Sequence, residues 1–138
     1  MEDILKAKSG YIRTYSGKYI MLNGLEQKDI CIEDIAHALA FKPRFNGNGK
    51  SWYSIARHSI AVSHLVSPRY KLIALLHDAS EAYLFDIPAP AKQYPEFKGI
   101  IELEDKIQSL VYEKYCLPED SNLISEIKTA DFMELQRE

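Results

Sequence analysis

The stretch Leu72-Ile73-Ala74-Leu75-Leu76-His77-Asp78-Ala79-Ser80-Glu81 joins a run of apolar residues to an imidazole and two carboxylates. Such an apolar run is typical of a segment that enters the core, where an unpaired charge costs several kcal/mol. A bound cation would remove this cost, because the carboxylates would become ligands and the histidine would stay neutral. A helix face turned toward solvent is the simpler explanation for a single aspartate, so a metal site requires further ligands elsewhere in the chain.

Two residues in other segments could complete such a site. His58 falls in the middle of an amphipathic segment, and Asp131 falls in the middle of the last helical segment. Neighbouring helical positions point about 100° apart, so His77 and Asp78 reach one ion only if it lies between them. The predicted ligands of one divalent ion are therefore His58, His77, Asp78 and Asp131. This mixed nitrogen and oxygen set suits Mn²⁺, Co²⁺, Fe²⁺, Ni²⁺ or Zn²⁺ better than Ca²⁺, and Mg²⁺ remains open.

Apolar periodicity and helix-breaking residues predict an all-α fold, a bundle of about five to six helices in one domain over residues 1–138. The predicted helices cover residues 32–42, 51–66, 69–85, 95–115 and 120–138. Turn-forming residues over 42–50 predict a loop. Alternating aromatic and β-branched residues over 11–22, around Ser16-Gly17, predict a short N-terminal β-hairpin with a two-residue turn.

Composition excludes several classes of protein. Apolar residues make up 46% of the chain and charged residues 27%, which is the balance of a globular protein rather than a disordered one. A net charge of -3 argues against a broad basic surface for extended nucleic acid. The two cysteines, Cys31 and Cys116, are expected to be reduced apolar fillers. With no apolar span of about 20 residues and no signal peptide, we expect no membrane contact and a cytoplasmic location.

The order His58, His77-Asp78 and Asp131 resembles the H…HD…D pattern of the HD-domain metal-dependent phosphohydrolases. The runs 77–81 (HDASE) and 86–92 (DIPAPAK) are similar to the signature of the 5′-deoxynucleotidase branch and of phage deoxynucleoside triphosphate hydrolases. The resemblance covers most of the chain, from about Tyr11 to Asp131. It implies an HD-domain helical bundle, a homo-oligomer (a dimer or larger) and hydrolysis of a (deoxy)nucleotide phosphate by metal-activated water. Relatives usually continue through at least one more helix, so we expect a domain shortened at its C-terminus.

The resemblance also implies roles for residues around the metal. Glu81 and Asp86 are the acid/base candidates: Glu81 is expected one turn beyond His77 on the same helix face. Asp86 is expected at a helix C-terminus, where a carboxylate opposes the helix dipole and a capping role is unfavourable. Arg44 matches the position of a phosphate-contacting arginine, and Lys92 follows the double proline, so each could bind phosphate or could be a solvated loop cation.

Aromatic residues offer a further contact to substrate. Trp52, Tyr53 and Tyr83 could stack on a base, although aromatics at helical spacing are more often part of the core. Of these, Trp52 is the candidate for substrate binding. The rival interpretations are a non-catalytic nucleotide-binding HD module acting as a sensor or regulator, a phosphodiesterase for a cyclic or short oligonucleotide, and a helical scaffold without a metal.

Overall fold

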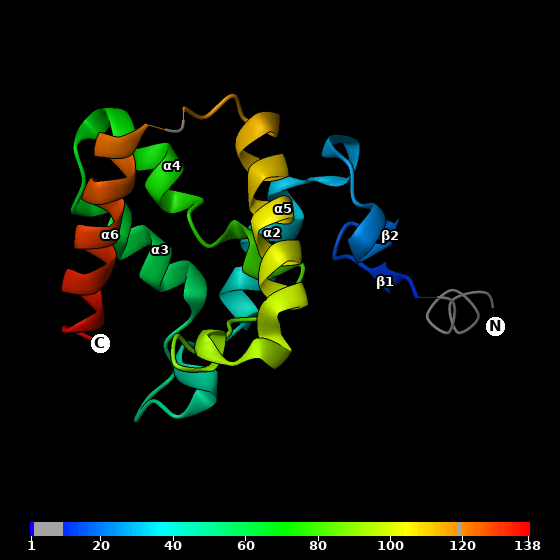
Figure 1. Ribbon diagram of the computed structural model, residues 1–138, viewed down its shortest axis with the longest axis horizontal. Coiled ribbons are helices and arrows are strands. Elements are labelled where there is room, and N and C mark those ends of the chain that lie inside the picture. The colour runs from blue at the N-terminus through cyan, green and yellow to red at the C-terminus, as the bar shows by residue number, and fades with distance from the viewer. Residues whose placement is uncertain (2–9, 119) are drawn as a thin grey trace.

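The computed structural model describes residues 1, 10–118 and 120–138, and these residues form a mainly α-helical fold (Figure 1). The segment 2–9, on which the expectation of no signal peptide rests, lies outside the described residues. The α-helices of the described part are α2 (Ile32–Phe41), α3 (Ile55–His64), α4 (Lys71–Leu75), α5 (Lys98–Lys114) and α6 (Ser121–Leu135). The prediction of an all-α fold with a short N-terminal hairpin is confirmed. None of the described helices has the length and apolar character needed to cross a membrane.

The hairpin has a longer turn than predicted. Strands β1 (Ile12–Arg13) and β2 (Tyr19–Ile20) pair antiparallel. The Thr14 backbone N–H donates to the Lys18 carbonyl at 2.8 Å, which leaves three residues in the turn. Gly17 adopts a φ of +87°, a left-handed conformation that glycine takes without steric cost. The predicted two-residue turn is therefore wrong.

Helix α3 links the two apolar clusters of the interior. One cluster joins the hairpin, α2 and α5, and the other joins α3, α4 and α6. Ile55 of α3 belongs to the first cluster and Val62 to the second. His58 lies three residues after Ile55 and four before Val62, so it shares their inward face and is fully buried. Packing on both sides thus fixes the position of this imidazole.

The predicted helix over 69–85 is wrong, because α4 ends at Leu75. A 3₁₀ turn over Ala79–Ala82 follows, and the chain is then irregular. An α-helix would join the Ser80 N–H to the Leu76 carbonyl, but the Gln108 side chain of α5 takes both groups. Its Nε2 donates to Leu76 O at 2.8 Å, and its Oε1 accepts from Ser80 N at 3.0 Å. The helix therefore breaks at the His77-Asp78 pair.

The loop ahead of α3 extends further than predicted. Residues 51–54 belong to it, and Ser54 caps α3 by accepting a hydrogen bond from the Arg57 N–H at 3.1 Å. The last helix begins where the sequence indicates, since the Asp120 side chain accepts from the Leu123 N–H at 2.7 Å. Both cysteines are free thiols, but Cys116 is exposed, so its expected role as a filler is wrong.

Candidate metal centre

Three chain segments bring two imidazoles and a carboxylate together. His58 comes from α3, His77 from the turn after α4, and Asp131 from α6. One ligand atom from each lies within 4.8 Å of the other two. The Nε2 atoms of His58 and His77 are 2.8 Å and 3.9 Å from the Asp131 Oδ1 atom. These residues are separated by up to 73 positions in the chain, so their meeting is a product of the fold.

Asp78 lies beside this triad. Its Oδ2 atom is 3.2 Å from His77 Nε2 and 3.7 Å from His58 Nε2. The structure thus brings all four predicted ligands together, although the break after α4 changes the geometry we expected for the His77-Asp78 pair. Their binding of a metal stays a prediction.

The hydrogen bonds behind the imidazoles define how they face the centre. His77 Nδ1 lies 2.6 Å from the Ala74 carbonyl oxygen, which can only accept, so Nδ1 carries the proton. His58 Nδ1 contacts the Glu138 carboxylate in the same way. In the neutral rings the Nε2 lone pairs therefore point toward Asp78 and Asp131. Both Nε2 atoms are buried, and their nearest polar neighbours are these carboxylates, with Asp131 Oδ1 2.8 Å from His58 Nε2 and Asp78 Oδ2 3.2 Å from His77 Nε2.

This donor set fits one divalent ion. Two lone pairs that face two carboxylates repel one another unless a cation lies between them. Ligands held about 2.1 Å from one ion at right angles would be about 3.0 Å apart. The imidazole-to-carboxylate distances at the centre, 2.8 to 3.9 Å, bracket that value. Neutral imidazoles and carboxylates are ordinary ligands of Mn²⁺, Co²⁺, Fe²⁺, Ni²⁺ and Zn²⁺.

The charges of the centre depend strongly on one another. Hydrogen-bonding proximity to His58 and then His77 holds the pKa of Asp131 well below its usual range. Burial lowers the pKa of His77, but Asp78, Asp131 and the Ala74 carbonyl together raise it to about 9. The pocket therefore favours positive charge at its centre, which a proton or a metal ion can supply.

Glu81 lies in the 3₁₀ turn after the helix break, so the expectation that it shares a helix face with His77 is wrong. Glu81 nevertheless lines one cavity together with Asp78 and Asp131. Its side chain is buried, and Oε2 has no hydrogen-bond partner among the described residues. Burial, followed by the charges of Asp78 and Asp86, raises the pKa of Glu81 to about 9.

A cavity of about 380 Å³ opens over the centre. Three further candidates line it, Arg44, Asp86 and Lys92. Asp86 follows an irregular segment rather than a helix, so its expected place at a helix C-terminus is wrong. Burial raises the pKa of Asp86, and the nearby Arg44 guanidinium opposes that shift. Lys92 Nζ is 3.0 Å from both carboxylate oxygens of Glu104.

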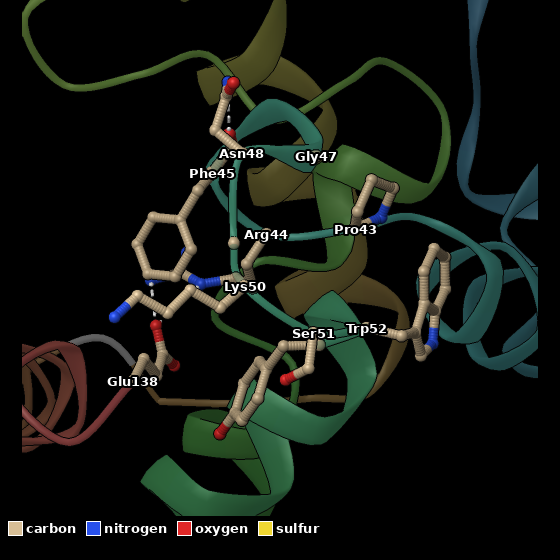
Figure 2. Close-up of a pocket in the computed structure, with 11 residues that line it drawn as sticks. Pro43, Arg44, Phe45, Gly47, Asn48, Lys50, Ser51, Trp52 and Glu138 are labelled. Carbon is tan, nitrogen blue, oxygen red and sulfur yellow. Dashed lines mark hydrogen bonds and ion pairs between the residues drawn. The ribbon is translucent and has the colours of Figure 1, made fainter.

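Trp52 lies in a different place. It lines a second cavity of about 710 Å³ formed by the loop ahead of α3, and it is 61% exposed (Figure 2). Arg44 and Phe45 line both cavities. The other two aromatic candidates have structural partners: Tyr53 donates to Glu134 at 3.0 Å, and Tyr83 is buried in the core.

Sequence reasoning missed the acidic face of α6 and its extension. Asp131, Glu134 and Glu138 are spaced by three and four residues, so they fall on one side of a helix. Glu134 bonds to Tyr53, and Glu138 contacts His58 and Arg44. This spacing could have indicated that the three carboxylates face the metal centre together. Acidic residues on one side of a helix usually face solvent, however, so the spacing alone does not distinguish the two cases. Gln108, which breaks the helix after Leu76, gave no signal at all.

Comparison with known proteins gives a family. The chain is 40% identical over 129 residues to the protein named uncharacterized protein YfdR of Escherichia coli K12, covering 93% of this chain and 70% of that protein. The chain belongs to the YfdR family. An uncharacterized protein of Rhodobacter capsulatus is also 40% identical, over 120 residues that cover 80% of this YfdR-family chain and 61% of the relative. No model of a protein family matches the chain.

Proposed function

We propose that this YfdR-family protein is a metal-dependent phosphohydrolase of the HD type that acts on a (deoxy)nucleotide. The observation that carries the proposal is the meeting of His58, His77 and Asp131, from three separate segments, with their ligand atoms within 4.8 Å. Asp78 adds a fourth ligand beside them. The order of these residues along the chain is the one that the resemblance to HD-domain phosphohydrolases requires.

Glu81 is the group we assign to proton transfer. A bound divalent ion would polarise the phosphate and lower the pKa of the attacking water. The Glu81 carboxylate lines the same cavity as two of the proposed ligands and has an oxygen without a hydrogen-bond partner among the described residues. With a pKa of about 9, Glu81 is protonated near neutral pH in the metal-free protein and would donate its proton to the leaving group. A bound divalent ion would lower this pKa, and Glu81 would then accept the proton of the attacking water first. Asp86, on the wall of the same cavity, is the second acid/base candidate.

Arg44 and Lys92 are the groups we assign to the phosphate. Both line the 380 Å³ cavity, whose size is in the range that holds small ligands. Each is already paired with a carboxylate, Glu138 and Glu104 respectively, which holds its side chain in a fixed direction. We expect the substrate to be a free nucleotide, as a monophosphate or a triphosphate, rather than an extended nucleic acid. The resemblance supports a homo-oligomer, and we place the reaction in the cytoplasm.

A panel of substrates tests this proposal. Nucleoside mono-, di- and triphosphates, cyclic dinucleotides and short oligonucleotides would be incubated with the protein and Mn²⁺ or Co²⁺, and released phosphate, pyrophosphate and triphosphate measured. We expect turnover of deoxynucleotides that is lost in Asp131→Asn. Binding of nucleotides without any turnover would instead favour a non-catalytic sensor module.

A further inference from the structure

Glu138 is buried at the end of the segment that follows α6, with a side chain only 1% exposed. Its two oxygens have different partners. Oε1 contacts Nδ1 of His58, and Oε2 accepts hydrogen bonds from Arg44 Nε at 3.2 Å and Nη2 at 3.1 Å. Figure 2 shows the Arg44 and Glu138 side chains pointing toward each other. One carboxylate thus joins a proposed metal ligand to a proposed phosphate-binding residue.

We propose that Glu138 is a positioning residue that orients the His58 imidazole toward the metal and the Arg44 guanidinium toward the phosphate. The inference rests on the metal site proposed above. A carboxylate behind a ligating histidine fixes the ring tautomer and raises the basicity of the other nitrogen. Here it places the proton on Nδ1 of His58 and leaves the Nε2 lone pair facing Asp78 and Asp131.

The same carboxylate fixes the direction of Arg44. The guanidinium uses its Nε and Nη2 atoms to reach Glu138, so its Nη1 edge is directed elsewhere. Arg44 is 12% exposed at its side chain and lines the cavity over the metal centre. A guanidinium has five N–H donors, so a second anion can be bound while the first is kept. Glu138 therefore supplies a rigid base for an anion-binding group.

Glu138→Gln separates these roles from simple packing. Glutamine has the same shape, but one end of its amide accepts and the other donates. It can accept from His58 or from Arg44, and its NH₂ group must then face the other donor. Glu134 provides a matched control, because it is a buried carboxylate on the same side of α6 that bonds to Tyr53.

Titration calorimetry with Mn²⁺ or Co²⁺ tests the inference. We expect Glu138→Gln to bind the ion about 10- to 100-fold more weakly than the natural chain. Glu134→Gln should remain within about threefold of the natural chain, and Glu138→Asp should recover part of the loss. Equal affinity in the natural chain and Glu138→Gln would overturn the role of Glu138 while leaving the proposed function intact. Absence of binding by the natural chain would overturn both.

A second measurement does not depend on any variant folding. In the natural chain saturated with diamagnetic Zn²⁺, nitrogen chemical shifts of His58 report which ring nitrogen carries the proton. A proton on Nδ1 supports the inference. A proton on Nε2, with the metal on Nδ1, overturns it.

Discussion

Two buried carboxylates, one in helix α2 and one in the 3₁₀ turn after α4, behave in opposite ways. Asp34 of α2 is 3% exposed, and its oxygens accept from the Ser16 N–H at 2.6 Å and the Ser16 hydroxyl at 2.9 Å. Glu81 is 4% exposed, and its Oε2 has no hydrogen-bond partner among the described residues. Burial raises the pKa of both, but the Ser16 hydrogen bonds bring that of Asp34 below its usual range.

The difference separates a structural carboxyl group, Asp34, from a functional one, Glu81. Asp34 connects the turn of the hairpin to α2, and both of its carboxylate oxygens accept hydrogen bonds from Ser16 in that contact. Glu81 lies near other carboxylates, and its Oε2 atom has no hydrogen bond within the described residues that would offset the cost of burial. A group kept in such surroundings is destabilising, which is common where a site needs a reactive side chain. The following experiments change one region or the other.

Glu81→Gln should have the largest effect, a loss of activity without a loss of stability. We expect kcat for the deoxynucleotide substrate to fall about 10²- to 10⁴-fold, because the side chain that transfers the proton is removed. The free energy of unfolding should stay the same or rise, since a buried carboxylate without a partner disappears. Kinetic assays and urea unfolding measure the two quantities. A loss of stability without a loss of turnover would reverse the roles we assign to the two regions.

Lys42→Met should lower the free energy of unfolding by about 2–3 kcal/mol. Lys42 directly follows α2, and its ammonium group donates to the carbonyls of Glu81, Ala82 and Leu84. These hydrogen bonds hold the turn that carries Glu81 in place. Methionine keeps the aliphatic stem but leaves these carbonyls without their donor. Lys50→Met, in the exposed part of the loop, is the control and should change stability by less than about 0.5 kcal/mol.

Asp34 should make unfolding depend on pH in the acid range, with a smaller effect of about 1–2 kcal/mol. The Ser16 hydrogen bonds oppose burial and hold the pKa of Asp34 below its unfolded value. The stabilisation is therefore complete above the unfolded pKa of about 4 and is lost as the pH falls through the lower, folded pKa. Urea unfolding of the natural chain and Asp34→Asn, from pH 7 to pH 2.5, checks this. Parallel curves for the two proteins would show that Asp34 is not the group responsible.

The sequence predicts well what depends on nearby residues. The bounds of α2 and the start of α6 follow from apolar spacing and the Asp120 cap, and the inward direction of His58 follows from Ile55 and Val62 on the same face. What it could not predict depends on partners far away in the chain. Gln108 breaks the helix after Leu76 from 32 positions away, and Glu138 meets His58 across 80 positions.

The central claim is that side chains from three segments share one ion. Elemental analysis after incubation with Mn²⁺ or Co²⁺ and removal of the excess tests it most directly. We predict one ion per chain, lost in His58→Ala and Asp131→Asn but kept in His64→Ala, which changes an exposed histidine of the same helix. Equal metal content in all four proteins, or none in the natural chain, would contradict the account.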